Sequence, residues 1–374
     1  MAAVRRRVML AVTMLPARQG DAIWLRWGDA GTPHQLLVDM GTEEAGKLVR
    51  QRIFDLDEAE RIFDLLVVTH VDRDHIGGVL SCLAEADPIP GLTIRDVWFN
   101  GYPHLTGGIV HTGLEPMGPA QGERLASWLK TQVWNAAFDG RAVVRAPDRP
   151  LTSMTLHDGL TLKALGPMPE RLTQLAPVWK EEVAEALRKG TLTTVSPGLE
   201  PMGPKVPPIL EDLEDLRQLA ATPTLADDSE ANGSTITLLL EYRNRRVLLA
   251  GDAIPEDLIA GIAAASPAGR LHLDAFKLPH HCSQRNIVRE LVEAVDCDHW
   301  LVSTDGTRFR HPDPIALARV VLHSTLRPAR LAFNVPSKFN GWWDNDEWRD
   351  LFKYKTQYGA PDSGLTITWD HNDN

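Results

Sequence analysis

Short apolar runs separated by polar turns recur along the chain, and their lengths are those of β-strands. Most of these runs are followed by Asp, His or Gly, which is typical of strands that deliver polar side chains at their ends. Strands are predicted at residues 8–15, 22–27, 35–41, 65–70, 236–242, 246–252, 275–281 and 299–304. The first two are expected to pair, because they lie at hairpin distance.

Between the strands, segments with helical patterning follow one another. The predicted helices span residues 43–54, 75–86, 121–138, 286–295 and 313–324. Strands and helices mixed at this spacing predict a layered α/β architecture. The chain of 374 residues is long enough to bury a sizeable core, and we expect one domain over residues 1–374.

The composition of the sequence changes between residues 103 and 230, where prolines, glycines and charged helical stretches are frequent. We interpret this segment as a largely helical insertion within the domain, and as a surface that could dock a protein partner. Residues 325–374 lie beyond the predicted core elements and are expected to form a C-terminal extension.

Charge and cysteine content narrow the function classes. A formal net charge of −11 argues against binding nucleic acid or an anionic membrane through clustered Lys and Arg. Three scattered cysteines and the lack of a membrane-length apolar run predict a cytoplasmic protein with no membrane partner. The N-terminus superficially resembles a signal peptide, but a buried first strand is favoured because its hairpin partner follows.

The stretch THVDRDHIGG at residues 69–78 packs two histidines and two aspartates into one turn after an apolar run. His70, Asp72 and Asp74 occupy alternate positions, so in an extended turn their side chains point the same way. His75 follows where a helix begins. One such residue alone is typical of a solvated turn, whereas four at this spacing indicate a metal site.

The pattern HxDxDHIGG resembles the HxHxDH signature of the metallo-β-lactamase fold, and more closely its variant in the competence-protein ComEC branch, where aspartate replaces the second histidine. Other stretches resemble landmarks of that branch in the same order: QGDAIWLRWG, LLVDMGT, NGSTITLLLEY, VLLAGDA, KLPHHCS and STDGTRFRHPDP. The resemblance covers about residues 8–100 and 230–325. It implies the metallo-β-lactamase αββα sandwich.

The resemblance also implies a centre of two divalent metal ions, Zn²⁺ or Mn²⁺. His70 and Asp72 would bind one ion, and Asp74 and His75 the other. Asp252, at the end of an apolar run, would bridge the two.

His280 and His281 also follow an apolar run, and one of them would complete the second site. Adjacent side chains of an extended segment point to opposite sides, so only one is expected to be a ligand, and His281 is favoured. The first site lacks the third histidine that is common in this fold. The remaining candidates to complete it, besides water, are Asn232, Asp227 and Asp228. Such an oxygen-rich site suits Mn²⁺ as well as Zn²⁺.

Several neighbours are candidates to support the site. Asp39 could orient a ligand histidine, and His311 could lie near a leaving group. Lys277 and Arg285 are candidate phosphate contacts. Cys282, which replaces a glycine of the HHGS motif, is interpreted as a tolerated small residue, with a thiolate ligand as the alternative.

These features predict a metal-dependent hydrolase. A hydroxide that bridges two divalent ions is available at neutral pH, because bound water loses several pKa units. A phosphodiesterase or nuclease is favoured, with Asp74, His280 and His311 as the catalytic residues and a nucleic acid or nucleotide as substrate. The alternatives are a hydrolase of a lactone, thioester or phosphorylcholine-type ester, and a metal-stabilised module that binds a partner without turnover.

Overall fold

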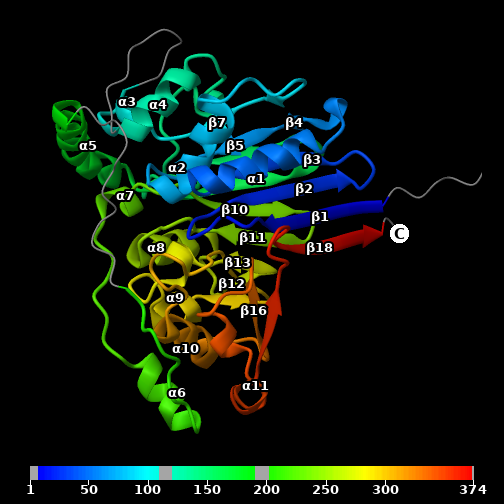
Figure 1. The fold of residues 1–374 in the computed structure, drawn as a ribbon, viewed down its shortest axis with the longest axis vertical. Coiled ribbons are helices and arrows are strands. Elements are labelled where there is room, and N and C mark those ends of the chain that lie inside the picture. Colours follow the sequence, from blue (N-terminus) through cyan, green and yellow to red (C-terminus); the bar gives the residue numbers. More distant parts are fainter. Residues whose placement is uncertain (1–6, 109–119, 190–201, 373–374) are drawn as a thin grey trace, which may run out of the picture.

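The computed structural model describes residues 7–108, 120–189 and 202–372. Over these residues the chain forms two large sheets that face each other, with helices on both outer sides (Figure 1). The expected αββα sandwich is therefore confirmed.

The first large sheet has six strands among the described residues, in the order β18-β1-β2-β3-β5-β7. Their bounds are β1 (Arg7–Met14), β2 (Ile23–Asp29), β3 (His34–Val38), β5 (Leu65–Val67), β7 (Val97–Trp98) and β18 (Leu365–Asn372). The expected hairpin of β1 and β2 is confirmed, and β3, β5 and β7 run parallel. The helical elements on or beside its outer side are α1 (Glu43–Phe54), α2 (Arg73–Val79), a π-helical turn (Leu80–Ala84), α3 (Tyr102–Leu105), α4 (Ala120–Leu129) and α5 (Pro169–Lys189).

The second large sheet has eight strands in the described part of the chain, in the order β17-β16-β15-β13-β11-β10-β9-β8. Their bounds are β8 (Ser153–Thr155), β9 (Thr161–Gly166), β10 (Thr237–Tyr242), β11 (Arg245–Leu249), β13 (Ala275–Lys277), β15 (Trp300–Val302), β16 (Ala329–Phe333) and β17 (Tyr354–Tyr358). The helices packed on its outer side are α6 (Leu213–Ala220), α8 (Pro255–Ala265), α9 (Arg289–Glu293), α10 (Pro314–His323) and α11 (Asp346–Phe352). Besides several 3-10 turns, the short elements include β4 (Ile62–Phe63), β6 (Thr93–Ile94), α7 (Glu230–Gly233), β12 (Leu271–Leu273) and β14 (Val295–Cys297).

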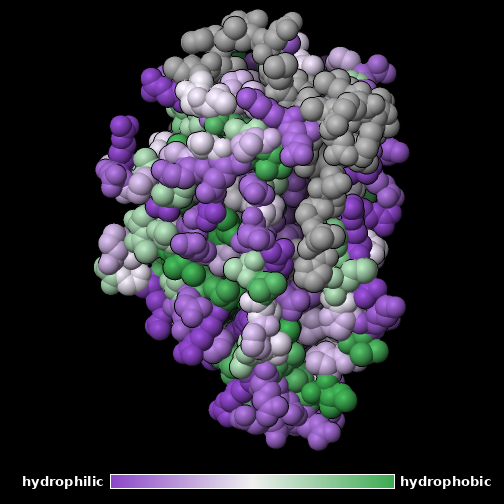
Figure 2. Space-filling model, turned by 90° about the vertical axis from the view of Figure 1, so that its left-hand side faces the viewer, coloured by the Kyte–Doolittle hydropathy of each residue, from purple (hydrophilic) through white to green (hydrophobic). Residues whose placement is uncertain are grey.

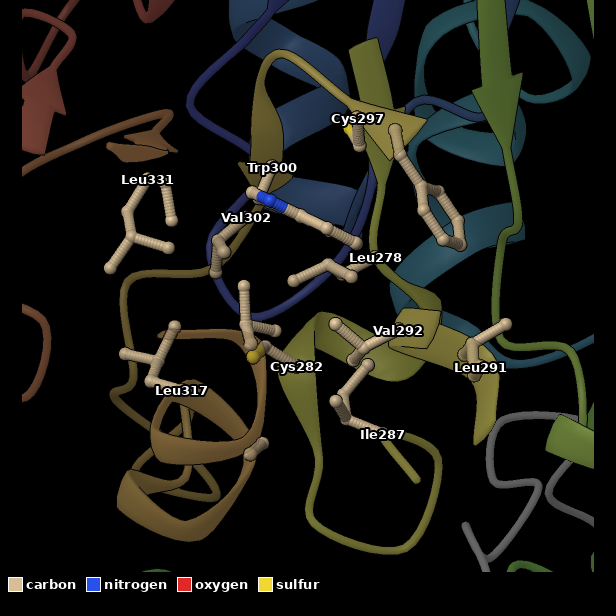
Figure 3. Close-up of a cluster of buried hydrophobic side chains, with 14 of the residues drawn as sticks. Leu278, Cys282, Ile287, Leu291, Val292, Cys297, Trp300, Val302, Leu317 and Leu331 are labelled. Carbon is tan, nitrogen blue, oxygen red and sulfur yellow. The ribbon is translucent and has the colours of Figure 1, made fainter. Parts of the chain in front are cut away.

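Strand alternation divides the apolar side chains among three layers of core. In β2, Leu25 points between the two sheets, whereas its neighbour Trp24 packs on the other side with Val49 of α1. The third layer lies between the second sheet and its helices, where Trp300 and Leu317 belong to one cluster (Figure 3). Each face of each sheet is thus covered by apolar side chains, which is what holds a layered domain together.

The boundaries expected for the insertion and the extension need correction. Strands β8 and β9 come from the segment 103–230, yet they pair within the second sheet. Strands β16 and β17 come from 325–374 and extend the same sheet, while β18 pairs with β1 along eight residues. Parts of both segments therefore belong to the sandwich itself. No helix in the described ranges is long and apolar enough to cross a membrane.

Candidate metal centre

The polar segments singled out in the sequence meet at one edge of the sandwich. Asp39 follows β3 and the segment 69–75 follows β5, and these two strands are parallel. Asp252 follows β11 and the histidine pair follows β13, which are also parallel. Parallel strands end at the same edge, so these loops converge at the left of Figure 1. Figure 2 views that side of the molecule, where hydrophilic and hydrophobic side chains are interleaved.

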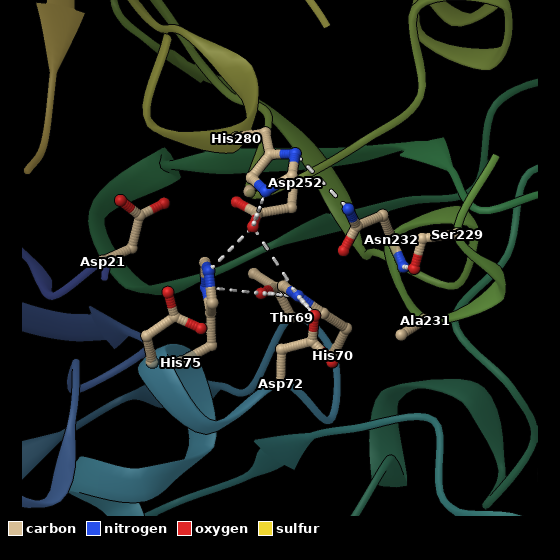
Figure 4. Close-up of polar contacts among 12 residues, drawn as sticks. Asp21, Thr69, His70, Asp72, His75, Ser229, Ala231, Asn232, Asp252 and His280 are labelled. Atoms are coloured by element: carbon tan, nitrogen blue, oxygen red, sulfur yellow. Dashed lines mark hydrogen bonds and ion pairs between the residues drawn. The ribbon is translucent and has the colours of Figure 1, made fainter. Parts of the chain in front are cut away.

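The centre of the cluster is the carboxylate of Asp252. Its Oδ2 lies 3.2 Å from Nε2 of His75, 3.4 Å from Nε2 of His281, 3.8 Å from Nε2 of His280 and 3.9 Å from Nε2 of His70. Figure 4 shows three of these imidazoles turned toward the carboxylate. Four rings from two separate segments therefore direct the same ring nitrogen at one point.

The other ring nitrogen of each imidazole contacts a hydrogen-bond acceptor. Nδ1 of His75 lies 2.8 Å from Oδ2 of Asp39, and Nδ1 of His281 lies 2.9 Å from the carbonyl oxygen of Ser303. Nδ1 of His70 lies 3.0 Å from the hydroxyl oxygen of Thr69. With a proton at Nδ1 in each contact, a neutral ring would present its Nε2 lone pair to the centre.

The buried atoms of this centre fit a cation. Among the described residues, Nε2 of His70, His75 and His281 and Oδ1 of Asp252 are buried without a hydrogen-bond partner. Buried polar atoms almost always have a partner, so a group of them at one point requires an explanation. Imidazole and carboxylate donors of this kind are the ligands of Zn²⁺ and Mn²⁺.

The two aspartates of the 69–78 segment lie near different histidines of this centre. Oδ2 of Asp72 is 3.7 Å from Nε2 of His70, and Oδ2 of Asp74 is 3.6 Å from Nε2 of His281. Asp72 caps helix α2 and Asp74 lies in its first turn. Asp72 therefore lies beside His70, and Asp74 lies beside His281.

Asp39 holds the motif in place from behind. Besides His75, its carboxylate accepts the backbone N–H of Thr69 at 2.8 Å and the Thr69 hydroxyl at 2.7 Å. Asp39 is fully buried and has a φ of 55°. It thus fixes both the end of the strand and the orientation of one imidazole, which agrees with its expected role.

The expectation that only one histidine of the pair faces the site is wrong. It assumed an extended backbone, whereas His280 and His281 have φ values of 48° and 53° in a tight turn. This left-handed turn directs both rings toward Asp252. His281 is buried, and the side chain of His280 retains 12% of its exposure.

The candidates for completing the first metal site lie in different places. Asp227 lies behind His280, with 3.3 Å between Oδ2 and Nδ1, and it accepts hydrogen bonds from Asn232 and Asn286. Oδ1 of Asn232 is buried without a partner in the described chain. Asp228 has a 91% exposed side chain and pairs with Arg285, so it lies outside the centre.

Asp21 is a residue of the site that sequence reasoning missed. Its carboxylate pairs with the buried Lys277, and its Oδ1 lies 3.4 Å from Nδ1 of His281. Lys277 is therefore buried and paired, so the prediction that it contacts a substrate phosphate is wrong. At the neighbouring Gly20, a Cβ would lie 1.7 Å from the backbone oxygen of Asp74. Only glycine allows the two loops to touch.

His311 and Cys282 lie beside the centre but face different environments. His311 is buried, and its ring centroid is 6.0 Å from that of His280. The thiol of Cys282 belongs to the core under the second sheet, beside Ile287 and Leu317 (Figure 3). Burial raises the pKa of this thiol well above its ordinary value. The tolerated-small-residue interpretation fits this position, and the thiolate alternative does not.

The electrostatics of the centre favour positive charge. Burial works to raise the pKa of Asp252, but the surrounding histidines lower it well below its ordinary value. Burial also opposes protonation of His75, yet Asp252 and Asp39 raise its pKa well above 6.5. Burial of Asp21 is likewise outweighed by Lys277, and its pKa falls to about 2. The carboxylates thus stay ionised and attract cations to the cluster.

The chain is only distantly similar to known proteins. No family model and no curated protein matches the sequence. Among solved structures, the metallo-β-lactamase fold protein YhfI from Bacillus subtilis is 12% identical, with a TM-score of 0.41, over 97% of this chain and 100% of that one. CmlA, a diiron β-hydroxylase from Streptomyces venezuelae, is 12% identical, with a TM-score of 0.37, over 98% of this chain and 54% of that one. Two facing sheets, helices outside them and a His/Asp cluster at their common edge define this chain as a protein with the metallo-β-lactamase fold.

Proposed function

We propose that the protein is a metal-dependent hydrolase that cleaves phosphodiesters. The observation that carries the proposal is the convergence of four imidazole Nε2 atoms on one buried carboxylate oxygen, that of Asp252. Such a set of donors binds divalent ions.

The ligands divide into two overlapping sets. His70, Asp72 and Asp252 would hold one divalent ion, and the buried Oδ1 of Asn232 is a candidate for a further ligand. The second ion would be held by a set that shares the carboxylate of Asp252: Asp74, His75 and His281. Two divalent ions at such a site lower the pKa of water and neutralise charge on an ester oxygen.

Several residues around the metal ligands would orient imidazole rings or move protons. Asp227 and Asn286 hold Nδ1 of His280, so that its Nε2 faces the centre. When protonated, this imidazole would donate the Nε2 proton to the departing oxygen of the substrate. His311 lies beside the ring and would act on the same leaving group. Asp39 keeps His75 in the ligand tautomer.

A phosphodiester is favoured over other esters by two arguments. The motif order resembles that of the ComEC branch, and a pair of ions suits a displacement at phosphorus in which the attacking and the leaving oxygen both carry charge. Hydrolysis of a lactone, thioester or phosphorylcholine-type ester uses the same donors, so substrate assays must separate these classes. Localisation in the cytoplasm and a protein partner for residues 103–230 stay predictions.

The test uses metal-stripped protein reloaded with Zn²⁺ or Mn²⁺. We expect hydrolysis of bis(p-nitrophenyl) phosphate and single-stranded DNA, and a loss of at least 100-fold in Asp74→Ala. The exposed Asp57→Ala serves as the matched control and should retain full activity. If neither diester is cleaved while p-nitrophenyl acetate or a lactone is, the diester proposal is wrong and the small-ester class replaces it.

A second variant tests the proton donor. His280→Gln should lose more activity on DNA, whose leaving oxygen is a poor leaving group, than on bis(p-nitrophenyl) phosphate, whose leaving group needs little protonation. An equal loss on both substrates would contradict the proton-donor role and favour His280 as a metal ligand.

A further inference from the structure

A second group of metal-ligand side chains lies at the opposite end of the sandwich. His34 begins β3, Asp64 precedes β5, and His157 lies in the turn between β8 and β9. Asp39 follows the other end of β3, and a rise of about 3.3 Å per residue puts His34 and Asp39 about 16 Å apart. This group, which we call the distal cluster, shares no residue with the candidate metal centre.

The distal cluster brings two imidazoles onto one carboxylate. Nδ1 of His34 lies 3.0 Å from Oδ2 of Asp64, and Nδ1 of His157 lies 2.7 Å from Oδ1. The two rings are stacked, with centroids 5.2 Å apart and planes 7° apart. The nearest ligand atoms of the three residues all lie within 4.8 Å of one another.

Surrounding contacts hold the three residues in position without a ligand. Trp27 stacks on His34 with 5.5 Å between ring centroids, and its indole N–H donates to the backbone oxygen of His157 at 2.9 Å. The Tyr242 hydroxyl contacts Asp158 at 2.6 Å in the same turn. Preorganised side chains lose little conformational entropy when they bind an ion.

The exposure of the cluster also suits an ion. The side chain of Asp64 is 4% exposed, whereas those of His34 and His157 are 36% and 54% exposed. A cation would thus have a buried anionic ligand, two imidazoles and access to water. Two nitrogen donors, one carboxylate and water are a common set for Zn²⁺.

We propose that His34, Asp64 and His157 form a second binding site for a divalent transition-metal ion of the Zn²⁺ class. Such an ion would join β3 and β5 of the first sheet to the β8–β9 turn of the second. The site has a structural role: it fastens an edge hairpin across the sandwich, at a distance from the candidate metal centre.

Arg95 provides an internal check on this site. Its Nε lies 3.0 Å from Oδ1 of Asp64, and its side chain is 52% exposed. A guanidinium there competes with a metal ion for the same carboxylate. Removing it with Arg95→Ala should therefore tighten metal binding about fivefold, whereas a cluster that serves only as a hydrogen-bond network gains no affinity.

The experiment is a titration of the metal-stripped full chain with Zn²⁺ by calorimetry. We expect His157→Ala to bind one ion fewer than the wild type and to lose part of the rise in melting temperature that Zn²⁺ produces. His157 is half exposed, so this variant should fold normally. The exposed His272→Ala is the matched control and should bind as many ions as the wild type.

Two results would overturn the proposal. One is equal Zn²⁺ stoichiometry in the wild type and His157→Ala. The other is unchanged affinity in Arg95→Ala. The variant His281→Ala should weaken binding at the candidate metal centre and leave the distal ion in place, so the two sites are distinguished.

Discussion

Replacing Asp39 with asparagine should change the metal centre, although the side chain of Asp39 does not face it. The carboxylate accepts three hydrogen bonds, two from Thr69 and one from Nδ1 of His75. An amide keeps the shape but presents N–H groups where one acceptor oxygen was. His75 must then hold its proton on Nε2, the atom that faces Asp252.

The expected magnitude follows from the lost contact. A hydrogen bond to a charged group contributes about 1.5 to 3 kcal/mol, which corresponds to a factor of about 10 to 150 in binding. Loss of residues that orient metal ligands typically weakens metal binding about 10- to 100-fold. We therefore expect Asp39→Asn to weaken Zn²⁺ binding at the metal centre by about 10- to 100-fold.

The assay is competition for Zn²⁺ with a chromophoric chelator at pH 7. The exposed Asp57→Asn controls for the loss of one negative charge, and urea denaturation of the metal-free proteins controls for folding. Wild-type affinity in a folded Asp39→Asn would refute the argument, because it would show that the proton position on His75 does not matter for metal binding.

Three further predictions concern stability. Burial lowers the pKa of His104 to about 4. Because the unfolded chain takes up this proton near pH 6.5, the neutral His104 stabilises the folded state above that pH, and about 3 kcal/mol of this stability is lost as the pH falls to 4. Urea denaturation should therefore show a weaker pH dependence of stability in His104→Gln than in the wild type. Cys282→Ala should cost about 1 kcal/mol of stability and leave metal content unchanged, whereas a drop in metal content would restore the thiolate alternative. Lys277→Met leaves the buried Asp21 without its cation and should cost about 3 to 5 kcal/mol in thermal or urea unfolding; a change in substrate affinity alone would instead favour a phosphate contact.

The sequence predicts those parts of the fold whose apolar runs are continuous. The buried strands β10 and β11 occur where the patterns predict them, because burial on both faces leaves an uninterrupted apolar run. The helix α1 also occurs where predicted, because its buried residues Ala45, Val49 and Ile53 recur at helical spacing. The edge strand β17, with the sequence YKTQY, was missed because only Tyr354 in it is buried. Its short alternation is weak until a neighbouring strand is known.

In the candidate site, too, local features could be predicted from the sequence and long-range contacts could not. The spacing within residues 69–78 is local, so it could be read from the sequence. The pairing of Asp21 with Lys277 joins residues far apart in the chain, and no local pattern reports it. The turn at 280 and 281 depends on left-handed backbone angles that non-glycine residues adopt only when the surrounding structure imposes them.

The most direct test of the central claim is anomalous diffraction from crystals grown with Zn²⁺, recorded at the zinc absorption edge. The account predicts two peaks beside the carboxylate of Asp252, each about 2.0 to 2.1 Å from imidazole Nε2 atoms. His70 should contact one peak, and His75 and His281 the other. If the crystals show no anomalous peak at Asp252, the cluster is a buried network of hydrogen bonds and ion pairs, and the metallo-hydrolase proposal is wrong.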